Sequence, residues 1–454
     1  ENVMPKFYVL ALLLVQSIFP LSAQEIASDH SSHQHAAKAV QQSVLPQSAA
    51  LYVCPMHPHI QQLYNLSCKP VRRIIGLMSG TSLDGLDIAL CELTGDGVAT
   101  SVRLLQFETM PYDDNYKQRV KAVFAKRSVD LQQVTLLNPW IATEHARLIN
   151  QCLQQWQVDA KDIDLIASHG QTVFHAPKRQ HQLSDYGNAT LQLGDGDHLA
   201  VATGITVISD FRQKHIAAGG EGAPLAVYGD YLLFSSVAEN RLLLNIGGIA
   251  NFTWLPASQD AQAVFSSDIG PGNTMMDAYM QRHFNQHYDA NGSIAGSGEV
   301  SESLLAALKH NDFFQLKCPK TTGPEVFNLA YLQQAQQSSG TAQLSHADVM
   351  ATLNRFSADM IISAIAQTTA QLDKFVIYAS GGGIHNPLLM KQIQTALPGV
   401  SIKTTHDLGI NPDAKEAVLF AVLANECLVG GKQKFSNARE GIPGVTMGKV
   451  SFAD

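Results

Sequence analysis

Residues 76–93, GLMSGTSLDGLDIALCEL, contain a short turn made of glycines and of residues with hydroxyl and carboxylate side chains. The apolar runs at 74–78 and 88–93 predict two strands of a β-hairpin around this turn. Glycine allows close backbone approach, hydroxyls and backbone N–H groups donate to phosphate, and carboxylates hold hydrated Mg²⁺. The turn is therefore either a plain hairpin connection or a phosphate loop. Its residues are Gly80, Thr81, Ser82, Leu83, Asp84, Gly85, Leu86 and Asp87.

Two further glycine groups follow apolar strands. In LLLNIGGIANFT, Gly247 and Gly248 leave backbone N–H groups open to a phosphate, although paired glycines equally suit a β-bulge. In YASGGGIHNPLLM, three glycines lie between the strand predicted at 375–379 and a helix led by Pro387. They let the backbone lie against a ring or a phosphate. These three are Gly381, Gly382 and Gly383.

Polar side chains also end two other predicted strands. Asp210 ends the strand at 205–209, and Arg212 follows two residues later. A carboxylate in this position suits a general base in a cleft, and equally a structural ion pair with the arginine. The stretch IASHGQTVFHAP places a polar cluster after an apolar run, which fits either a sugar-facing wall or satisfied structural groups. That cluster comprises Ser168, His169, Gln171 and His175.

A Gly-Pro-Gly turn in SSDIGPGNTMMDAYM precedes a helix predicted to begin near Thr274. The N-terminus of a helix attracts negative charge and donates backbone N–H groups. We therefore expect the start of this helix and Asp268, which lies just before the turn, to face the same ligand.

The elements that must position these groups are strands alternating with helices. Runs such as DIALCEL, RLLLNIGGIANFTWL and FVIYASGGG are apolar and β-rich, whereas 139–156, 347–372 and 413–429 have apolar residues at helical spacing. This alternation predicts an α/β protein with helices on the faces of its sheets, in two similar lobes. A Rossmann dehydrogenase is a poor fit, because no Gly-x-Gly-x-x-Gly phrase is followed by a ribose-binding acid.

Composition narrows the class further. The chain has 454 residues, 45% of them apolar, and a spread net charge of −8. No basic stripe with interleaved aromatics occurs, so a nucleic-acid partner is not expected. Six cysteines lie far apart, and the apolar surroundings of Cys91, Cys152 and Cys427 indicate free thiols rather than a disulfide framework.

The first seventy residues differ from the rest. Residues 1–24 have the layout of a secretory signal peptide, and 25–72 read as a disordered linker. Within the linker, LYVCPMHPHI resembles the short heavy-metal-binding element of periplasmic copper-efflux proteins, without its later Cys-Pro-x-Cys-Gly-Met run. Sulfur and imidazole groups at this spacing suit Cu(I) or Zn²⁺, and a vestigial leader is the alternative. The groups concerned are Cys54, His57, His59 and Cys68.

From about residue 73 to 450, the motifs in their order resemble the anhydro-N-acetylmuramic acid kinase family. The matching stretches are 76–87, 168–172, 192–195, 210–225, 245–251, 268–273 and 381–386. The resemblance implies the two-lobed fold of actin, Hsp70-type ATPases and hexokinases, with ATP and Mg²⁺ in the cleft between the lobes. It places the lobes at 73–240 and 241–454, with the C-terminal helix returning to the first lobe, and suggests a homodimer.

The resemblance also implies a double reaction. Water opens the 1,6-anhydro bridge of 1,6-anhydro-N-acetylmuramic acid while ATP phosphorylates the released O6, giving N-acetylmuramic acid 6-phosphate for cell-wall recycling. Asp210 would take the proton from the attacking water, and Asp84 or Asp87 would lie near Mg²⁺. The implied nucleotide groups are 80–87, Gly247, Gly248 and 381–383. The implied substrate groups are Ser168, His169, Gln171, Arg212, Asp268, Asn273 and Glu416.

The chain departs from the family pattern at several positions. His215 stands where the family has Asp, and Glu221 where it has Gln. Residues 226–227 read Ala-Val instead of Val-Pro, and 320–324 read Lys-Thr-Thr-Gly-Pro instead of Lys-Ser-Thr-Gly-Arg. We expect these changes to affect the sugar pocket or its pH dependence and to leave the base in place.

An export signal conflicts with a reaction that consumes cytoplasmic ATP. We therefore expect a cytoplasmic enzyme whose leader is a fusion or gene-model accident, with no membrane partner for the kinase. The alternatives are an exported protein that binds metal or cell-wall sugar without catalysis, and a kinase for an ordinary hexosamine.

Overall fold

The computed structural model describes residues 58–369, 374–431, 434–438 and 441–454, all within one compact unit, Val53–Asp454. The predicted signal peptide at 1–24 lies outside the described residues, as do Cys54 and His57. Residues 58–68, which the sequence placed in a linker, form helix α1 (Pro58–Cys68). His59 of this helix pairs with Asp454 at 3.0 Å, and the Cys68 thiol is exposed and free.

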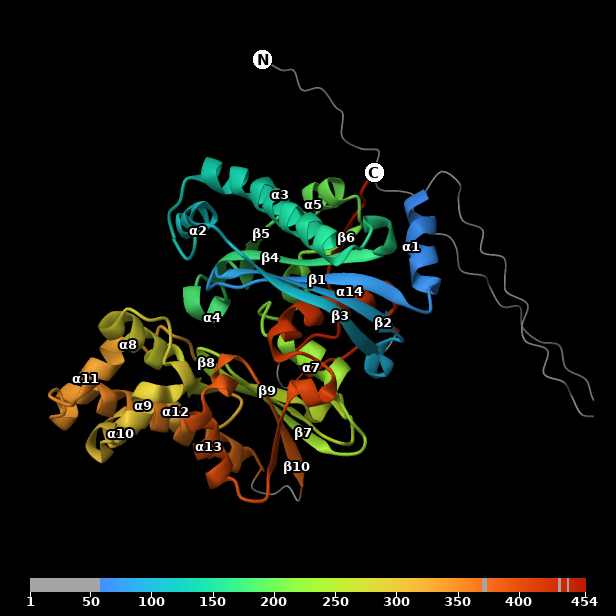
Figure 1. The fold of residues 1–454 in the computed structure, drawn as a ribbon. Coiled ribbons are helices and arrows are strands. Elements are labelled where there is room, and N and C mark those ends of the chain that lie inside the picture. The colour runs from blue at the N-terminus through green and yellow to red at the C-terminus, as the bar shows by residue number, and fades with distance from the viewer. Residues whose placement is uncertain (1–57, 370–373, 432–433, 439–440) are drawn as a thin grey trace, which may run out of the picture. The chain divides into compact units, whose positions relative to one another are not determined.

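Sheet A begins with three antiparallel strands and continues with parallel ones (Figure 1). Its strand order is β3-β2-β1-β4-β6-β12, with β5 paired to β4; β4 and β6 run parallel to β1, and β12 is antiparallel to β6. The strands are β1 (Arg72–Ser79), β2 (Gly85–Thr94), β3 (Ser101–Pro111), β4 (Leu165–Ala176), β5 (Ala189–Leu193), β6 (Val207–Ser209) and β12 (Lys449–Ser451).

Sheet B repeats this plan. Its order is β9-β8-β7-β10-β11, in which β7, β8 and β9 are antiparallel while β10 and β11 run parallel to β7. Each sheet is thus a three-stranded meander whose first strand is followed by parallel neighbours, which confirms the expected two-lobed α/β ATPase fold. The strands are β7 (Asn240–Ile246), β8 (Ile249–Leu255), β9 (Phe265–Pro271), β10 (Phe375–Ser380) and β11 (Ser401–Thr404).

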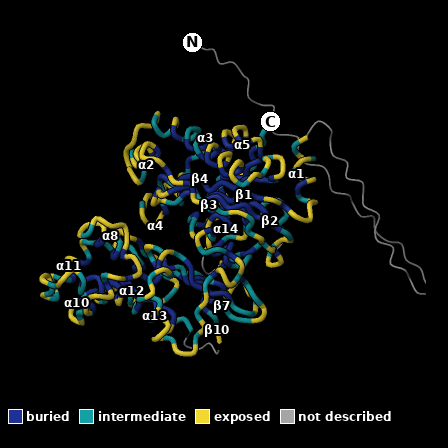
Figure 2. The backbone as a smooth tube through the Cα atoms, viewed as in Figure 1, coloured by how far each residue is buried: buried dark blue, intermediate teal, exposed yellow. Residues whose placement is uncertain are grey.

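Helices cover the outer faces of both sheets, and the strands beneath them are buried (Figures 1 and 2). On sheet A, α3 is the longest of these; Asp130 caps its start by accepting from two backbone N–H groups, and Ile141, His145 and Ile149 lie on its buried stripe. These helices are α2 (Asp114–Lys121), α3 (Leu131–Trp156) and α5 (Gly196–Thr203) on sheet A, and α12 (His346–Thr369) and α13 (Pro387–Ala396) on sheet B.

A helical layer beyond sheet B has its own core. Met280, Leu304 and Phe356 are buried together in it. Together with α12 it comprises α8 (Thr274–Phe284), α9 (Ser293–Ser297), α10 (Glu302–Lys309) and α11 (Leu329–Ser339). Two short helices remain: α4 (Lys178–His181) connects β4 to β5, and α6 (Phe211–Ala217) follows β6.

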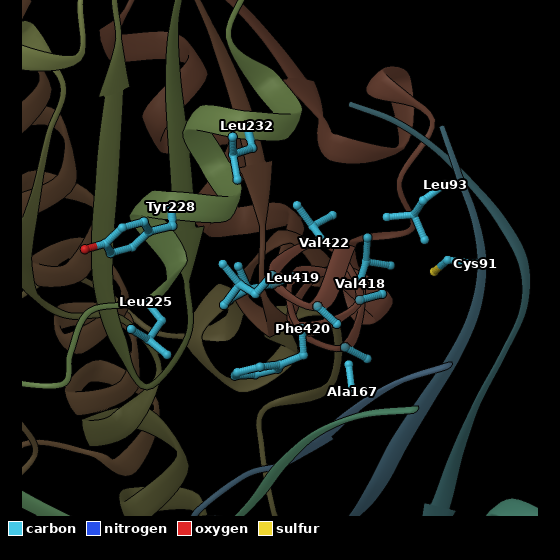
Figure 3. Close-up of a cluster of buried hydrophobic side chains, with 14 of the residues drawn as sticks. Cys91, Leu93, Ala167, Leu225, Tyr228, Leu232, Val418, Leu419, Phe420 and Val422 are labelled. Carbon is cyan, nitrogen blue, oxygen red and sulfur yellow. The ribbon is translucent and has the colours of Figure 1, made fainter. Parts of the chain in front are cut away.

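Helix α14 (Lys415–Val429) packs against sheet A and against α7 (Ala226–Phe234), which in turn contacts sheet B. Figure 3 shows Val418, Leu419 and Phe420 of α14 between the α7 side chains and strand residues such as Cys91. A Cβ on Gly76 of β1 would lie 1.9 Å from the Ala417 carbonyl oxygen, so glycine lets α14 approach the strand directly. The start of α14, with Glu416, is thereby held beside the end of β1.

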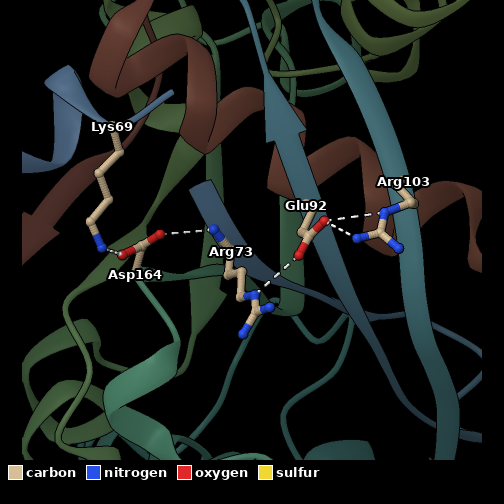
Figure 4. A network of polar contacts seen from close by, with 5 residues as sticks. All are labelled: Lys69, Arg73, Glu92, Arg103 and Asp164. Carbon is tan, nitrogen blue, oxygen red and sulfur yellow. Dashed lines mark hydrogen bonds and ion pairs between the residues drawn. The ribbon is translucent and has the colours of Figure 1, made fainter. Parts of the chain in front are cut away.

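A surface network ties α1 and the first strands together (Figure 4). Asp164 accepts from Lys69 Nζ at 2.5 Å and from the Arg73 backbone N–H at 2.8 Å. Glu92 accepts from Arg73 at 3.2 Å and from Arg103 at 3.1 Å. Because most of these side chains are exposed, each pair contributes only about 0–1 kcal/mol.

The described cysteines are all free. Cys91 and Cys152 are buried, as predicted, and burial raises the pKa of their thiols to about 12 and about 11. Cys427 is half-buried. The buried thiols of Cys91 and Cys152 are therefore inert packing groups at neutral pH.

Candidate active site

The predicted phosphate loop is the turn between β1 and β2. Leu83 has a φ of 60° and is buried, whereas Thr81, Ser82 and Asp84 are exposed. Anchoring by a buried leucine turns the hydroxyls and the carboxylate outward, where they can meet a ligand. The hairpin predicted from the sequence is confirmed by the antiparallel register of Met78 with Asp87.

A buried hydrogen-bond chain supports this loop from behind. Gln171 is completely buried; its Oε1 accepts from Ser79 Oγ at 2.6 Å, and its Nε2 donates to the Gly80 carbonyl at 3.3 Å. The Tyr112 hydroxyl lies 2.7 Å from Ser79 Oγ and 2.9 Å from His145 Nε2. Gln171 is thus engaged with the loop, and its expected contact with substrate stays a prediction.

The support chain is uncharged at neutral pH. Burial lowers the pKa of His145 to about 3 and raises the pKa of Tyr112 well above its ordinary value. Tyr116 stacks on Tyr112 with ring centroids 3.7 Å apart and lies 3.1 Å from His145. Sequence reasoning missed Tyr112 and His145, since neither stands in a motif.

Carboxylates gather beside the loop. Asp87 accepts from Thr109 Oγ1 at 2.6 Å, and its pKa is raised by burial and by the like charges of Asp413 and Asp84. Solvent reaches Glu416, yet the protein packed around its carboxylate raises the pKa, and the charge of Asp87 adds to this effect. Sequence reasoning did not single out Asp413.

The carboxylates suit Mg²⁺ chemically but do not form a closed cage. Among the described residues, no three His, Cys, Asp or Glu side chains are grouped closely enough to hold a metal ion. Mg²⁺ characteristically keeps several waters and takes one or two carboxylates plus substrate phosphates. Asp84 and Asp87 therefore fit a metal that arrives with a nucleotide, whereas His59 and Cys68 form no metal cluster with other described residues.

Asp210 lies at the end of β6, at the start of α6, with a left-handed φ of 56°. Its Oδ2 contacts Lys449 Nζ. Arg212 instead donates to His169 Nε2 at 3.0 Å and to the Gly222 carbonyl at 2.6 Å. The Asp210–Arg212 ion pair that the sequence left open is therefore absent from the ion pairs of the described residues. Arg212 instead holds the His169 ring and the Gly222 backbone.

His215 performs a defined task at its unusual position. Its Nδ1 accepts from the Gly222 backbone N–H at 2.9 Å, and a Cβ on Gly220 would lie 2.1 Å from its ring. Burial and the charge of Arg212 lower the pKa of His215 to about 4, so the ring stays neutral and keeps its acceptor. Glu221, the other departure, pairs with Arg179 at 3.0 Å.

Several buried polar atoms in this region have no hydrogen-bond partner among the described residues. Arg212 donates to His169 Nε2, so the neutral ring carries its proton on Nδ1, which is unpartnered. His215 Nε2 and Ser168 Oγ are also unpartnered. Since buried polar groups are nearly always bonded, each of these atoms is available to a polar ligand or a water molecule. Burial lowers the pKa of His175, and the positive charge of Arg212 lowers it further, so His175 lies within electrostatic range of Arg212.

The lobe built on sheet B contributes a second set of groups. Asp268 accepts from the Thr322 backbone N–H at 2.9 Å; burial raises its pKa, while Arg179 from the sheet A lobe opposes the rise. The Asn273 side chain donates to the Ile246 carbonyl at 3.3 Å, at the start of α8. Asp268 and Glu221 thus both lie within electrostatic range of Arg179.

The two glycine groups, 247–248 and 381–383, have different structural roles. Gly247 and Gly248 form the two-residue turn of the β7–β8 hairpin, for which the sequence left open a phosphate site or a β-bulge. A Cβ on Gly381 would lie 2.6 Å from Asn245 Oδ1, and one on Gly383 would lie 2.2 Å from the Ile246 side chain. Gly382 is exposed and open, so it is the member of its trio best placed to meet a nucleotide.

The carboxyl ends of parallel strands carry the phosphate loop, Asp210 and the glycine turns in both sheets. Ligands of open α/β sheets bind outside these strand ends. The chain belongs to the class of two-lobed, ATP-dependent sugar kinases.

Comparisons with known proteins identify the family. The family model for anhydro-N-acetylmuramic acid kinase matches residues 72–437, and the chain belongs to this family. The anhydro-N-acetylmuramic acid kinase of Pseudoalteromonas atlantica is 64% identical over 401 residues, which cover 88% of this chain and 100% of the relative. That of Pseudoalteromonas translucida is 62% identical over the same coverage. That of Caldanaerobacter subterraneus is 36% identical over 396 residues, 86% of this chain and 99% of the relative.

Proposed function

We propose that this protein uses ATP to open and phosphorylate 1,6-anhydro-N-acetylmuramic acid, giving N-acetylmuramic acid 6-phosphate for cell-wall recycling. The observation that carries the proposal is the placement of Asp210. Asp210 follows the end of β6 and has a partly exposed carboxylate. The phosphate loop follows the end of β1, which is separated from β6 in the sheet by β4 alone. Close relatives that bear this activity in their names match nearly the whole described chain.

The reaction requires two groups on opposite faces of the sugar. Asp210 takes a proton from water as the water oxygen bonds to C1, and the C1–O6 bond breaks. O6 then bonds to the γ-phosphorus of ATP, and the bond to the ADP oxygen breaks. Holding water, sugar and nucleotide in one arrangement supplies much of the rate enhancement.

The phosphate loop supplies positioning and charge stabilisation for the transferred group. Backbone N–H groups at 80–85 and the Thr81 and Ser82 hydroxyls would hold the phosphates, with Asp84 and Asp87 directed to Mg²⁺. The metal neutralises charge on the phosphate oxygens when it is bound. Gly247, Gly248 and Gly382 would border the nucleotide.

The sugar pocket would be lined by the unpartnered groups of His169 and Ser168 and by the Glu416 carboxylate. His169, Ser168 and Glu416 would meet its hydroxyl and carboxylate groups, and the Arg212 guanidinium would hold a negative group. Burial lowers the pKa of Arg212 to about 10, while Glu416 opposes the change, so Arg212 remains charged at neutral pH. Asp268 and Asn273 would approach from the other lobe.

We further propose that the enzyme works as a homodimer in the cytoplasm, where its ATP is available. The described residues include no helix that is both long and apolar enough to cross a bilayer.

The test uses the full chain with 1,6-anhydro-N-acetylmuramic acid, ATP and Mg²⁺ in ¹⁸O-water, with mass spectrometry of the sugar product. We expect a phosphorylated product that carries one ¹⁸O, and a loss of at least about 100-fold in rate for Asp210→Asn, because general-base catalysis contributes about 10²–10⁴-fold. Phosphorylation of N-acetylglucosamine with the anhydro sugar untouched would point to a hexosamine kinase. Binding without turnover would leave a sugar-binding protein.

A further inference from the structure

Lys449 contacts the proposed base, Asp210, and lies beyond the residues matched by the family model, which end at 437. It opens strand β12, which pairs antiparallel with β6. In that register Lys449 lies opposite Ser209, the residue directly before Asp210. Its ammonium group contacts Asp210 Oδ2.

Contacts on both sides of Lys449 hold β12 in place. Gly448 has a φ of 111°, and a Cβ there would lie 2.4 Å from the Ile208 side chain, so the strand approaches β6 closely. Beyond the strand, Phe452 stacks on His59 with ring centroids 4.0 Å apart, and Asp454 pairs with the same histidine. The ammonium group is therefore presented from a fixed backbone, although the Lys449 side chain is largely exposed.

Lys449 is the cation that Asp210 pairs with among the described ion pairs. The nearby Arg212 is directed to His169 and Gly222 instead. Lys449 occupies one carboxylate oxygen, Oδ2, while Oδ1 has no hydrogen-bond partner among the described residues. A carboxylate held by one oxygen has a defined orientation and keeps the other oxygen for a proton.

We propose that Lys449 is a positioning residue, which holds Asp210 Oδ2 so that Oδ1 faces the attacking water. This rests on the function proposed above. Because the contact of Lys449 is with the base, removing this lysine should slow turnover without weakening sugar binding. Misplacing a catalytic group by about 1 Å is enough to slow a reaction by about 100-fold, so a partial loss of orientation should be easily measured.

The test compares Lys449→Met, Lys449→Arg and a matched control, Lys69→Met, which removes a similar lysine–carboxylate pair at the other end of the same sheet. Steady-state kcat, KM for the anhydro sugar and thermal unfolding are measured on the full chain. We expect Lys449→Met to lower kcat about tenfold with KM within twofold of wild type and an unchanged unfolding temperature. Lys449→Arg should recover at least half of kcat, and Lys69→Met should match wild type.

A double variant separates action through Asp210 from a general effect. In the Asp210→Asn background, Lys449→Met should cause no further loss, since the two changes act on one unit. A wild-type kcat in Lys449→Met overturns the inference, and so does a lower kcat that comes with a lower unfolding temperature and no rescue by arginine. If the wild-type chain itself makes no product, the proposed function fails, and the role of Lys449 fails with it.

Discussion

At the scale of single residues, His215 and Arg212 are joined through the backbone of Gly222. His215 accepts from the Gly222 N–H, and the Gly222 carbonyl accepts from Arg212, which also donates to His169. The neutral imidazole of His215 supplies an acceptor to the Gly222 backbone without placing a further charge beside Arg212. The effect of this departure on the sugar pocket stays a prediction.

The depressed pKa of His215 links stability to pH. The unfolded chain protonates this histidine near its ordinary pKa of 6.5, whereas the folded chain does so only near pH 4. Between these values the unfolded state binds more protons, so the stability contribution is complete above pH 6.5 and is lost as the pH falls toward 4. The variant His215→Asn keeps an acceptor but cannot titrate. Between pH 7 and pH 5 we expect its free energy of unfolding to fall by about 1–2 kcal/mol less than that of the wild type.

Urea unfolding at the two pH values measures this difference. The comparison with the variant is needed because the raised pKa of Asp277, about 6 as a result of burial, works in the opposite direction. Parallel pH dependences in the two proteins would contradict the assignment.

At the scale of elements, α3 and β4 support the phosphate loop from behind through buried side chains. His145 from α3, Tyr112 after β3, Ser79 of β1 and Gln171 of β4 form one hydrogen-bonded series that ends at the Gly80 carbonyl. Hydrogen bonds in such a buried series strengthen one another, and an interrupted one leaves unpaired polar groups. The loop's conformation therefore depends on elements far along the chain.

The stacked tyrosines provide a matched test of this support. Tyr112→Phe removes the hydroxyl that joins Ser79 Oγ at 2.7 Å to His145 Nε2 at 2.9 Å, whereas Tyr116→Phe removes a hydroxyl that lies 3.1 Å from His145 and interacts more weakly with Ser79 and Tyr112. We expect Tyr112→Phe to lower kcat/KM for ATP about tenfold and Tyr116→Phe to change it less than threefold. The first loss corresponds to about 1.4 kcal/mol, within the range for orphaning a buried group. Equal effects of the two variants on ATP kinetics would rule out a specific role for the series.

At the scale of the whole molecule, one apolar cluster includes residues of both sheets. It contains Ile74 and Cys91 of sheet A, Leu243 and Leu255 of sheet B, and most of α14 between them. Because α14 carries Glu416 at its start, the packing of this helix on β1 also sets the position of a carboxylate in the site.

Gly76 controls that packing. In Gly76→Ala the added Cβ would meet the Ala417 carbonyl at 1.9 Å, so α14 must move. We expect the free energy of unfolding to fall by about 1–3 kcal/mol, as for other overpacked cores, together with a higher KM for the sugar. Urea unfolding and steady-state kinetics measure both effects. Gly187→Ala is the control, since no heavy atom lies within 4 Å of its added Cβ, and similar losses in both variants would contradict the prediction.

The sequence by itself determined the features that depend on neighbouring residues. The hairpin and loop at 72–94, the helices led by Thr274 and Pro387, and the position of Asp210 at a strand end follow from local hydrophobic periods and turn residues. The role of Gly247 and Gly248 was ambiguous, because two glycines after an apolar strand suit a β-bulge as well as a ligand site.

Only the tertiary structure decided which distant residues complete the site. Lys449 comes from a three-residue strand, too short for a periodic pattern, and His145 and Tyr112 stand in no motif. Likewise, nothing local in the sequence distinguishes Gln171 as a support of the loop from Gln171 as a contact of the sugar. These assignments depend on long-range packing of α14, β12 and α3 against sheet A, and side chains brought together across hundreds of residues leave no local pattern in the sequence.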